Sequence, residues 1–297
     1  MNVATMRTVA KRYGDHVVLD GLDLGIERSE VFALLGPNGS GKTTTVEILE
    51  GYRRADAGSV KVLGHDPAMR AEALRARIGV VLQHTTAFEH VTVGELVELF
   101  AALYPAPLSA GDVIRSVGLE SKVDEVAATL SGGQRRRLDV ACGIVGRPDL
   151  LFLDEPTTGL DPVARRELWM LIAGLREQGT TIVLTTHYLE EAEALADRIG
   201  VLLGGRLAAV GTPGELVRHG RACARVSFMP PAGVPEFDAW DRHGRSVWVD
   251  TDRPTELVAS LAATHGELAG LVVRRPSLED VYLEMVARWG QADEVSA

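Results

Sequence analysis

A glycine-rich run with a single lysine, residues 36–43, has the residue types and spacing needed to hold phosphate groups. It fits the pattern GxxxxGK[ST], follows the apolar run 31–35 and precedes a helix-like run that ends near residue 50. In this setting the backbone N–H groups surround phosphate, the lysine reaches the β- and γ-phosphates, and the threonine hydroxyl ligates Mg²⁺. A plain glycine turn with a solvated lysine is the alternative, which the flanking strand and helix disfavour. The candidate residues are Gly36, Pro37, Asn38, Gly39, Ser40, Gly41, Lys42, Thr43 and Thr44.

Two acids, Asp154 and Glu155, follow the apolar run 150–153 and form a second candidate. Ligands of open α/β sheets bind at the carboxyl ends of the strands, so we expect both side chains beside the phosphate-binding loop. There Asp154 suits Mg²⁺, and Glu155 suits the polarisation of an attacking water. Acids that only begin a solvated loop are the alternative, and the glycine-rich motif makes it less favourable.

The sequence LSGGQ at residues 130–134 is a third candidate, and an amphipathic stretch follows it. Two glycines leave the amides of a helix N-terminus open to an anion, and a serine hydroxyl adds a donor. Three arginines, residues 135–137, then occupy the first helical turn, where the helix dipole disfavours cations; a nearby polyphosphate would offset that cost. The alternative is an ordinary turn with a solvated basic face. The candidate residues are Ser131, Gly132, Gly133 and Gln134.

With these motifs, residues 1–215 resemble the nucleotide-binding subunit of ATP-binding cassette (ABC) transporters. LSGGQ is similar to the family's signature sequence, which few other ATPases combine with a P-loop. The resemblance implies that ATP and Mg²⁺ are bound, that Glu155 and Lys42 act in catalysis, and that His187 is the switch histidine at the γ-phosphate. Taken by itself, His187 is a helix-capping residue.

The resemblance assigns three further residues. It implies that Tyr13 stacks on adenine, and that Gln83 touches Mg²⁺ together with Thr43 and Asp154 and relays the nucleotide state to a membrane partner. Asp161 resembles a residue of the loop that crosses the dimer interface. Without the resemblance, Tyr13 is a half-buried strand aromatic, Gln83 a turn residue and Asp161 a helix N-cap.

The C-terminal sequence PSLEDVYL, residues 276–283, and the RRRL after the signature narrow the resemblance to drug-export-type, daunorubicin-resistance-like ATPases. These pair with separate ABC-2 type permeases, which implies a place on the cytoplasmic face of the cell membrane, held through the permease. One chain has one P-loop and one signature. Two chains arranged head to tail, as a homodimer or with a second ABC ATPase, would place each signature over the other's ATP.

Composition limits the partners. The net charge of −10 gives no general electrostatic attraction to nucleic acid, so no nucleic-acid partner is expected. The longest run without a charged residue has 13 residues, too short for a membrane helix of about 20. Cys142 and Cys223 cannot form a disulfide framework, and residues 1–4 begin no export signal, so a reducing cytoplasm is expected.

Short β-branched runs that alternate with amphipathic stretches predict an α/β fold. Capping residues predict helices that begin after Thr92, Asp161 and Thr212. The expected fold is a P-loop ATPase cassette over residues 1–215, with a mixed sheet core, an antiparallel β subdomain and a helical subdomain at about 84–147. Strands are predicted at 31–35, 60–63, 78–82, 150–154, 181–185 and 199–203.

The pattern changes after residue 216. An extended connection at 229–235, strands at 246–250 and 268–274, and helices from 254 and from 277 to about 289 predict a small α+β domain over 216–297. Two other functions stay open. One is a soluble ABC ATPase acting on ribosomes or DNA, which would normally carry two cassettes or a long coiled coil, and neither is in the sequence. The other is an ATP-dependent protein that sequesters a small molecule without a permease.

Overall fold

The computed structural model describes residues 1–83, 90–219, 223–230, 237 and 240–296. The chain divides into two compact units, Met1–Pro213 and Gly214–Ala297. The first unit contains the three motifs. In the part of the chain that is described, no helix combines the length and the apolar character needed to cross a membrane.

A six-stranded mixed sheet forms the centre of the first unit, in the order β5-β6-β7-β3-β8-β9. Five strands are parallel and β9 is antiparallel to β8. Every residue of β3 and β6 is buried, as expected of parallel strands covered on both faces. The predicted α/β cassette with a mixed sheet is thereby confirmed. The strands are β3 (Val31–Leu35), β5 (Ile78–Val81), β6 (Leu150–Asp154), β7 (Thr181–Thr186), β8 (Arg198–Leu203) and β9 (Arg206–Gly211).

A second, antiparallel sheet has the order β2-β1-β4, with β1 at Asn2–Tyr13, β2 at His16–Glu27 and β4 at Ala57–Val62. Helix α1 (Lys42–Leu49) buries Val46, Ile48 and Leu49 in one core with side chains of both sheets. The P-loop that precedes α1 is therefore anchored to the main core of this unit. Short turns follow at Pro67–Met69 and in α2 (Glu72–Arg75).

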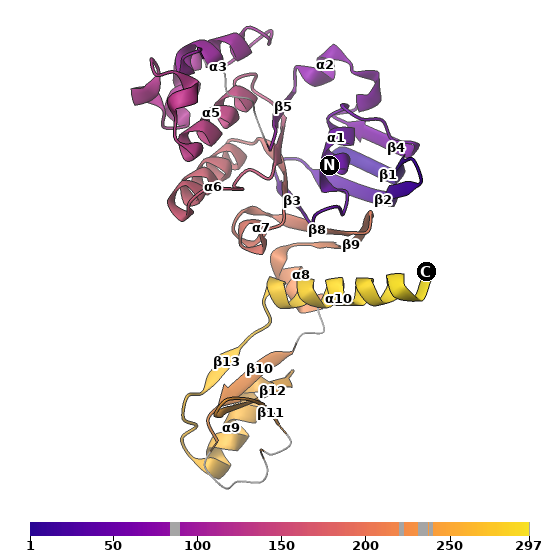
Figure 1. Ribbon diagram of the computed structural model, residues 1–297, viewed down its shortest axis with the longest axis vertical. Helices are drawn as coiled ribbons and strands as arrows, with labels where there is room; N and C mark the ends of the chain where they lie inside the picture. Colours follow the sequence, from indigo (N-terminus) through magenta and orange to yellow (C-terminus); the bar gives the residue numbers. More distant parts are fainter. Residues whose placement is uncertain (84–89, 220–222, 231–236, 238–239, 297) are drawn as a thin grey trace. The chain divides into compact units, whose positions relative to one another are not determined.

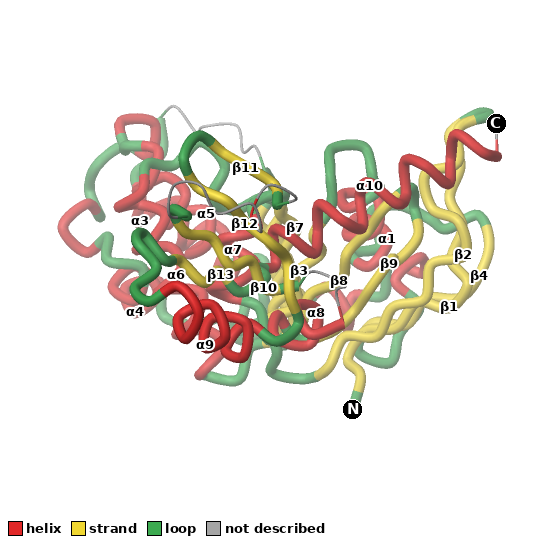
Figure 2. Tube along the Cα trace, turned by 90° about the horizontal axis from the view of Figure 1, so that it is seen from below, coloured by secondary structure: helices red, strands yellow, loops and turns green. Residues whose placement is uncertain are grey.

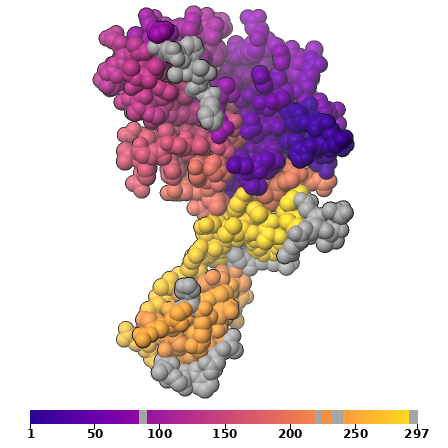
Figure 3. All heavy atoms as spheres, in the orientation of Figure 1, coloured from indigo at the N-terminus to yellow at the C-terminus, as the bar shows by residue number. Residues whose placement is uncertain are grey.

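Helices α3 (Val93–Ala101), α4 (Ala110–Ser116) and α5 (Gly132–Ile144) lie on the side of the first unit opposite β1, β2 and β4 (Figures 1 and 2). Short 3-10 turns at Glu120–Lys122 and Ala127–Thr129 join α4 to α5. Thr92 and Glu95 cap α3 reciprocally, as predicted. Residues 84–89 of the predicted helical subdomain lie outside the described residues. In the space-filling view the helical segment and the N-terminal strands occupy separate parts of this unit's surface (Figure 3).

Helices α6 (Pro162–Glu177) and α7 (Leu189–Leu195) complete the first unit. Asp161 caps α6 by accepting hydrogen bonds from the N–H groups of Val163 and Ala164, and Pro162 is in the first turn, as predicted. Helix α8 (Pro213–His219) begins where the sequence placed it, after Thr212.

The second unit contains a four-stranded antiparallel sheet in the order β11-β12-β10-β13. Phe228, Phe237, Val247, Leu261 and Leu268 form its core. The helix predicted from residue 254 is α9 (Pro254–His265), and the last helix, α10 (Leu278–Ser296), is longer than predicted. The strands are β10 (Ala224–Phe228), β11 (Asp241–His243), β12 (Ser246–Thr251) and β13 (Val272–Arg274).

Two details of this unit differ from the sequence prediction. The strand predicted at 268–274 begins only at Val272, because Leu268 enters the core and a turn closed by Leu271 N–H to the Leu268 carbonyl, with Gly270 at φ +66°, precedes it. Strands β10 and β11 were not predicted. Most of the predicted connection, residues 231–236, is outside the described residues.

Candidate functional site

The loop between β3 and α1 depends on glycine at two positions. A Cβ on Gly36 would lie 2.3 Å from the carbonyl oxygen of Leu202, so a side chain there collides with β8. Gly41 has φ +103° and ends the loop as the N-cap residue of α1, with no side-chain capping bond. The first amides of α1 are therefore free of a side-chain cap, which is the arrangement that anions occupy at helix N-termini.

Lys42 is the first residue of α1, and its side chain is only 5% exposed. Its ammonium donates to the carbonyl oxygens of Gly36 at 2.8 Å and Pro37 at 3.1 Å. Burial lowers the pKa of Lys42, and the nearby carboxylates of Glu155 and Asp154 oppose that shift. Because the buried ammonium of Lys42 binds two carbonyl oxygens of its own loop, it can exchange these partners for an anion such as phosphate.

A depression of about 440 Å³ opens over this loop. Most of its lining residues are candidates named from the sequence, while two come from the start of β2. Its volume is within the range of small-molecule sites. The lining residues are His16, Val18, Asn38, Gly39, Gly41, Lys42, Thr43, Thr44, Gln83 and Glu155.

The carboxylate of Glu155 is where several candidates meet. Its Oε1 lies 3.1 Å from Nδ1 of His187 and 3.9 Å from Nζ of Lys42. Its Oε2 accepts hydrogen bonds from Nε2 of Gln83 at 3.1 Å and from Oγ1 of Thr158 at 3.2 Å. Thus four side chains from four separate segments surround one carboxylate, and a water beside it would face both a base and a cation.

Thr185 positions both acids. Its hydroxyl donates to Oδ1 of Asp154 and accepts the backbone N–H of Glu155 at 3.0 Å. Glu155 has φ +43°, a strained conformation for a residue with a side chain, and strain of this kind concentrates at functional sites. Thr185 was not among the candidate residues, although its position at the end of a predicted strand placed it at the same sheet edge.

His187 follows β7, and the hydroxyl of Thr186 accepts the N–H of Tyr188 at 2.9 Å in the same turn. Glu191 of α7 is buried, and its Oε1 accepts a hydrogen bond from the indole N–H of Trp169 at 3.3 Å. Burial raises the pKa of Glu191, while hydrogen bonds from Thr186 and Thr157 lower it. Glu191 was not found from the sequence, because an acid in a helix pattern carries no signal of burial.

The signature residues lie at the start of α5. Ser131 is the N-cap, its hydroxyl accepts the N–H of Gln134, and the Gln134 side chain accepts the N–H of Ser131. Gly132 faces open space, and a Cβ on Gly133 would lie 2.7 Å from Cβ of Ala164. None of these four residues lines the depression over the P-loop of the same chain.

The three arginines after the signature were predicted either to lie near a polyphosphate or to form a solvated basic face. The second prediction is wrong, because Arg136 is buried and Arg135 and Arg137 are half-buried. Each guanidinium donates to backbone carbonyls of its own chain: Arg135 to Ala128, and Arg137 to Val117 and Gly118. Arg136 is buried and donates to three carbonyl oxygens, and Oδ2 of Asp139 lies 3.7 Å from its Nη1. These carbonyls stabilise the three cations in the first turn of α5, where the helix dipole disfavours positive charge.

Two further candidates, Tyr13 and Asp161, do not line the depression. Tyr13, at the end of β1, is 41% exposed, with the guanidinium of Arg53 5.3 Å and the ammonium of Lys11 5.5 Å from its ring centre. Asp161 caps α6, and hydrogen bonds from the Ala164 and Val163 amides lower its pKa. Both side chains have partners within the chain, and the structure assigns neither to a ligand.

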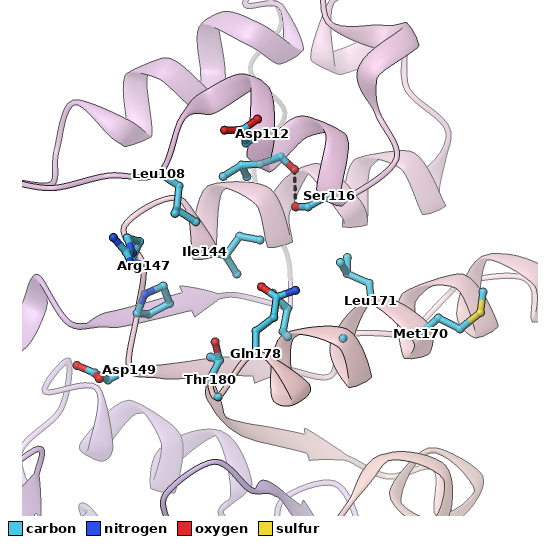
Figure 4. A pocket seen from close by; sticks show the side chains of 15 residues that line it. Leu108, Asp112, Ser116, Ile144, Arg147, Asp149, Met170, Leu171, Gln178 and Thr180 are labelled. Atoms are coloured by element: carbon cyan, nitrogen blue, oxygen red, sulfur yellow. Dashed lines mark hydrogen bonds between the residues drawn. The ribbon is translucent and has the colours of Figure 1, made fainter.

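A larger hollow lies elsewhere in the first unit. It has about 640 Å³ and is lined by residues of α4, the end of α5 and α6, among them Leu108, Ser116, Met170 and Gln178 (Figure 4). None of the residues predicted to do chemistry lines it. The depression over the P-loop is smaller, so the convergence of side chains, not volume, identifies the candidate site.

Comparison with known sequences identifies the family of the chain. The family model described as "ABC transporter" matches residues 19–158. Daunorubicin resistance ATP-binding protein DrrA3 of Streptomyces coeruleorubidus is 41% identical, with 95% of each chain covered. A Nod factor export ATP-binding protein I of Ralstonia nicotianae is 37% identical, with 96% of this chain and 94% of the relative covered.

Solved structures share the fold of the first unit. An ATP-binding subunit of an ABC transporter covers 73% of this chain with a TM-score of 0.66 and 27% identity, and 92% of that chain is matched. A dimeric bacterial ABC transporter cassette covers 70% with a TM-score of 0.62 and 27% identity, and 98% of it is matched. The P-loop, the acids at the end of β6 and these relatives agree, and the chain belongs to the ABC transporter family as an ATP-binding subunit that hydrolyses ATP.

Proposed function

We propose that this subunit powers the export of a drug or natural product through a separate membrane permease of the ABC-2 type. The single observation that carries the proposal is the meeting of Lys42, Gln83 and His187 at the carboxylate of Glu155. The printed names of the relatives, which concern daunorubicin resistance and Nod factor export, support an exporter.

Each side chain at the site has a proposed task. Glu155 acts as general base toward the attacking water, and His187 holds the γ-phosphate near it. Lys42 leaves the carbonyls of Gly36 and Pro37 for the β- and γ-phosphates, while the backbone N–H groups of residues 38–44 surround these phosphates. Gln83 reports the state of the site, because the hydrogen bond that it donates to Glu155 competes with water and phosphate.

The residues present fit Mg²⁺. Thr43, Gln83 and Asp154 supply hydroxyl, amide and carboxylate oxygens, the hard donors that Mg²⁺ prefers. Ser40 of the same loop has a buried hydroxyl without a hydrogen-bond partner in the described chain, so the loop has polar capacity to spare. Bound there, Mg²⁺ would neutralise negative charge on the phosphates.

The active form in this proposal is a head-to-tail dimer, either of two identical chains or with a second ABC ATPase. The signature residues of one chain do not line that chain's own depression, and Gly132 presents open space at the start of α5. The similarity to a dimeric cassette supports this arrangement. In it, Ser131, Gly132, Gly133 and Gln134 meet the partner's ATP, Asp161 lies near the interface, and Tyr13 stacks on adenine.

The permease docks, in this proposal, beside Gln83 and the segment after it, up to residue 104. Leu99 and Leu103 of that segment are 51% and 71% exposed, which supports a partner that covers them. Residues 84–89 are outside the described part of the chain. The subunit is then held at the cytoplasmic face of the membrane, while residues 1–215 bind ATP and residues 216–297 form an accessory domain.

Co-expression with the product of a neighbouring reading frame, if that frame encodes about six membrane helices, tests this proposal. The expected result is co-purification of the two proteins and drug resistance that needs both, and that Lys42→Ala abolishes. Resistance conferred by this chain alone, with a drug bound to residues 216–297, would instead support sequestration without a permease.

A further inference from the structure

We propose that Arg136 is a positioning residue for ATP hydrolysis, because it fixes the backbone on both sides of Glu155 and next to Gln83. Arg136 lies outside the LSGGQ residues and has no described contact with the depression. The inference rests on the proposed role of Glu155 as the base, and it adds a residue that controls where that base stands.

The guanidinium of Arg136 donates to three carbonyls in two separate segments of the chain. Its Nη2 donates to the carbonyl of Asp154 at 2.9 Å, and its Nε donates to the carbonyl of Pro156 at 2.8 Å. These carbonyls flank Glu155 in the chain. Its Nη1 donates at 2.5 Å to the carbonyl of Leu82, the residue before Gln83. One guanidinium therefore holds the neighbours of two site residues that are themselves hydrogen-bonded.

The chemistry of these contacts requires an arginine. The side chain is 8% exposed, and the guanidinium offers five N–H donors in a fixed plane. Burial lowers the pKa of Arg136, and the charges of Asp139, Asp154 and Glu191 oppose that shift. A lysine at this position has one ammonium on a flexible stem, and it cannot place donors on three carbonyls in the same geometry.

Glu155 needs such support, because its backbone has φ +43°. Thr185 holds its N–H from the side of β7, through both the hydroxyl at 3.0 Å and the carbonyl at 3.2 Å. Arg136 holds the carbonyls on either side from α5. With one of these supports removed, the peptide can relax, and a displacement of about 1 Å at a reacting group costs as much as 10²-fold in rate.

The helix that carries Arg136 is itself fixed. The reciprocal cap of Ser131 and Gln134 holds its first turn, and Gly133 is packed against Ala164 of α6. Arg136 is therefore anchored at the Cα end as well as at its guanidinium, which is what a residue needs in order to position another.

Arg136→Lys and Arg136→Met in the full chain test the inference, with Arg137→Met as the matched control. Arg137 also donates to two carbonyls, but these belong to Val117 and Gly118, away from the site. We expect Arg136→Lys to lower kcat for ATP roughly 10- to 100-fold while the KM and the affinity for ATP change less than about 3-fold. Arg137→Met should change kcat less than about 3-fold.

A second measurement separates positioning from a general loss of structure. Once Glu155→Gln has removed the base, adding Arg136→Lys should lower the residual turnover less than about 2-fold, because residues that act as a unit are not additive. Three results would overturn the inference and make Arg136 only structural. The losses of kcat in Glu155→Gln and Arg136→Lys could multiply in the double variant, or Arg136→Lys could lower the affinity for ATP as much as kcat. The third is that Arg137→Met lowers kcat as much as Arg136→Lys.

The outcomes also distinguish this inference from the proposed function. If Glu155→Gln leaves hydrolysis unchanged, the proposed base is wrong and the inference falls with it. If Glu155→Gln stops hydrolysis and Arg136→Lys does not slow it, only the inference is wrong. If Arg136→Met fails to fold, Arg136→Lys, which keeps the positive charge, still tests the inference.

Discussion

His187 and Glu155 face each other because of the register of two parallel strands. Asp154 of β6 is paired with Thr185 of β7, so the residues that follow, Glu155 and His187, leave the same edge of the sheet. Nδ1 of His187 ends 3.1 Å from Oε1 of Glu155. The relationship between the proposed base and the proposed γ-phosphate partner is thus fixed by the sheet, not by a mobile loop.

The first prediction is that Glu155→Gln keeps ATP bound but slows hydrolysis roughly 10²- to 10⁴-fold, the usual contribution of a positioned base. The amide has the size of the carboxylate but cannot accept the proton of water. Single-turnover hydrolysis of Mg-ATP measures the effect, and Glu177→Gln, at the exposed end of α6, is the control. Hydrolysis at the normal rate in Glu155→Gln would falsify the role of Glu155.

A second prediction concerns Lys42→Ala. The change removes a charge-assisted contact to phosphate, which is worth about 1.5–3 kcal/mol, so we expect ATP affinity to fall roughly 10- to 100-fold. The ATP-free protein should remain folded, because the loss of a buried cation partly offsets the loss of its two carbonyl contacts.

Equilibrium binding of a fluorescent ATP analogue measures the loss, and Lys61→Ala on β4 is the control, since Lys61 is exposed. Equal affinity in Lys42→Ala and Lys61→Ala would rule out the P-loop assignment.

A third prediction is a dependence of stability on pH. Burial raises the pKa of Glu50, at the end of α1, to about 8, and the charges of Asp154 and Glu47 add to the shift. Between about pH 4.5 and 8 the unfolded chain therefore binds fewer protons at this residue than the folded chain, so its contribution to stability falls as pH rises.

Glu50→Gln cannot ionise, so it should be more stable than the natural chain at pH 8, by on the order of 1–3 kcal/mol, and nearly equal to it at pH 4. Urea unfolding of the ATP-free protein at both pH values measures this difference. If the gain in stability is the same at both pH values, or equal to that of the exposed Glu177→Gln, the half-buried Glu50 is not protonated in the folded chain at neutral pH.

The motifs whose residues are adjacent in the chain were predictable from the sequence, but the contacts between distant segments that support them were not. The glycines and Lys42 are adjacent in the chain, and the end of β6 follows from its apolar pattern, so both could be located without coordinates. The carbonyl contacts of Arg136 and the double role of Thr185 join segments far apart in sequence, and nothing in their local pattern indicates it. The same reason explains β10 and β11, whose pairing with β12 depends on the tertiary fold.

A fourth prediction is that the chain ending at Pro213 still binds ATP. All residues that line the depression, as well as His187 and Asp154, belong to the first unit, whose core includes both of its sheets. We expect weaker dimerisation or weaker assembly with a permease instead. ATP titration together with the heat-unfolding transition measures both points, and a folded truncated chain without ATP binding would place part of the site in residues 214–297.

The fifth prediction tests whether two chains share each ATP site. Lys42→Ala damages the P-loop, and Ser131→Arg puts a bulky side chain at the N-terminus of α5, where the signature is proposed to meet the partner's γ-phosphate. A homodimer of either variant has two damaged sites. In a mixed dimer, one site carries both defects and the other has an intact P-loop and an intact signature.

Mixing the two variants should therefore restore one occluded ATP in each mixed dimer. The number of ATP molecules retained after rapid removal of free nucleotide is the quantity to measure, because turnover requires more than occupancy. Native mass spectrometry counts the mixed dimers, so that occupancy is expressed per mixed dimer. Mixed dimers that form and retain no ATP contradict a signature acting in trans, because in a head-to-tail pair the undamaged P-loop of one chain must meet the undamaged Ser131 of the other.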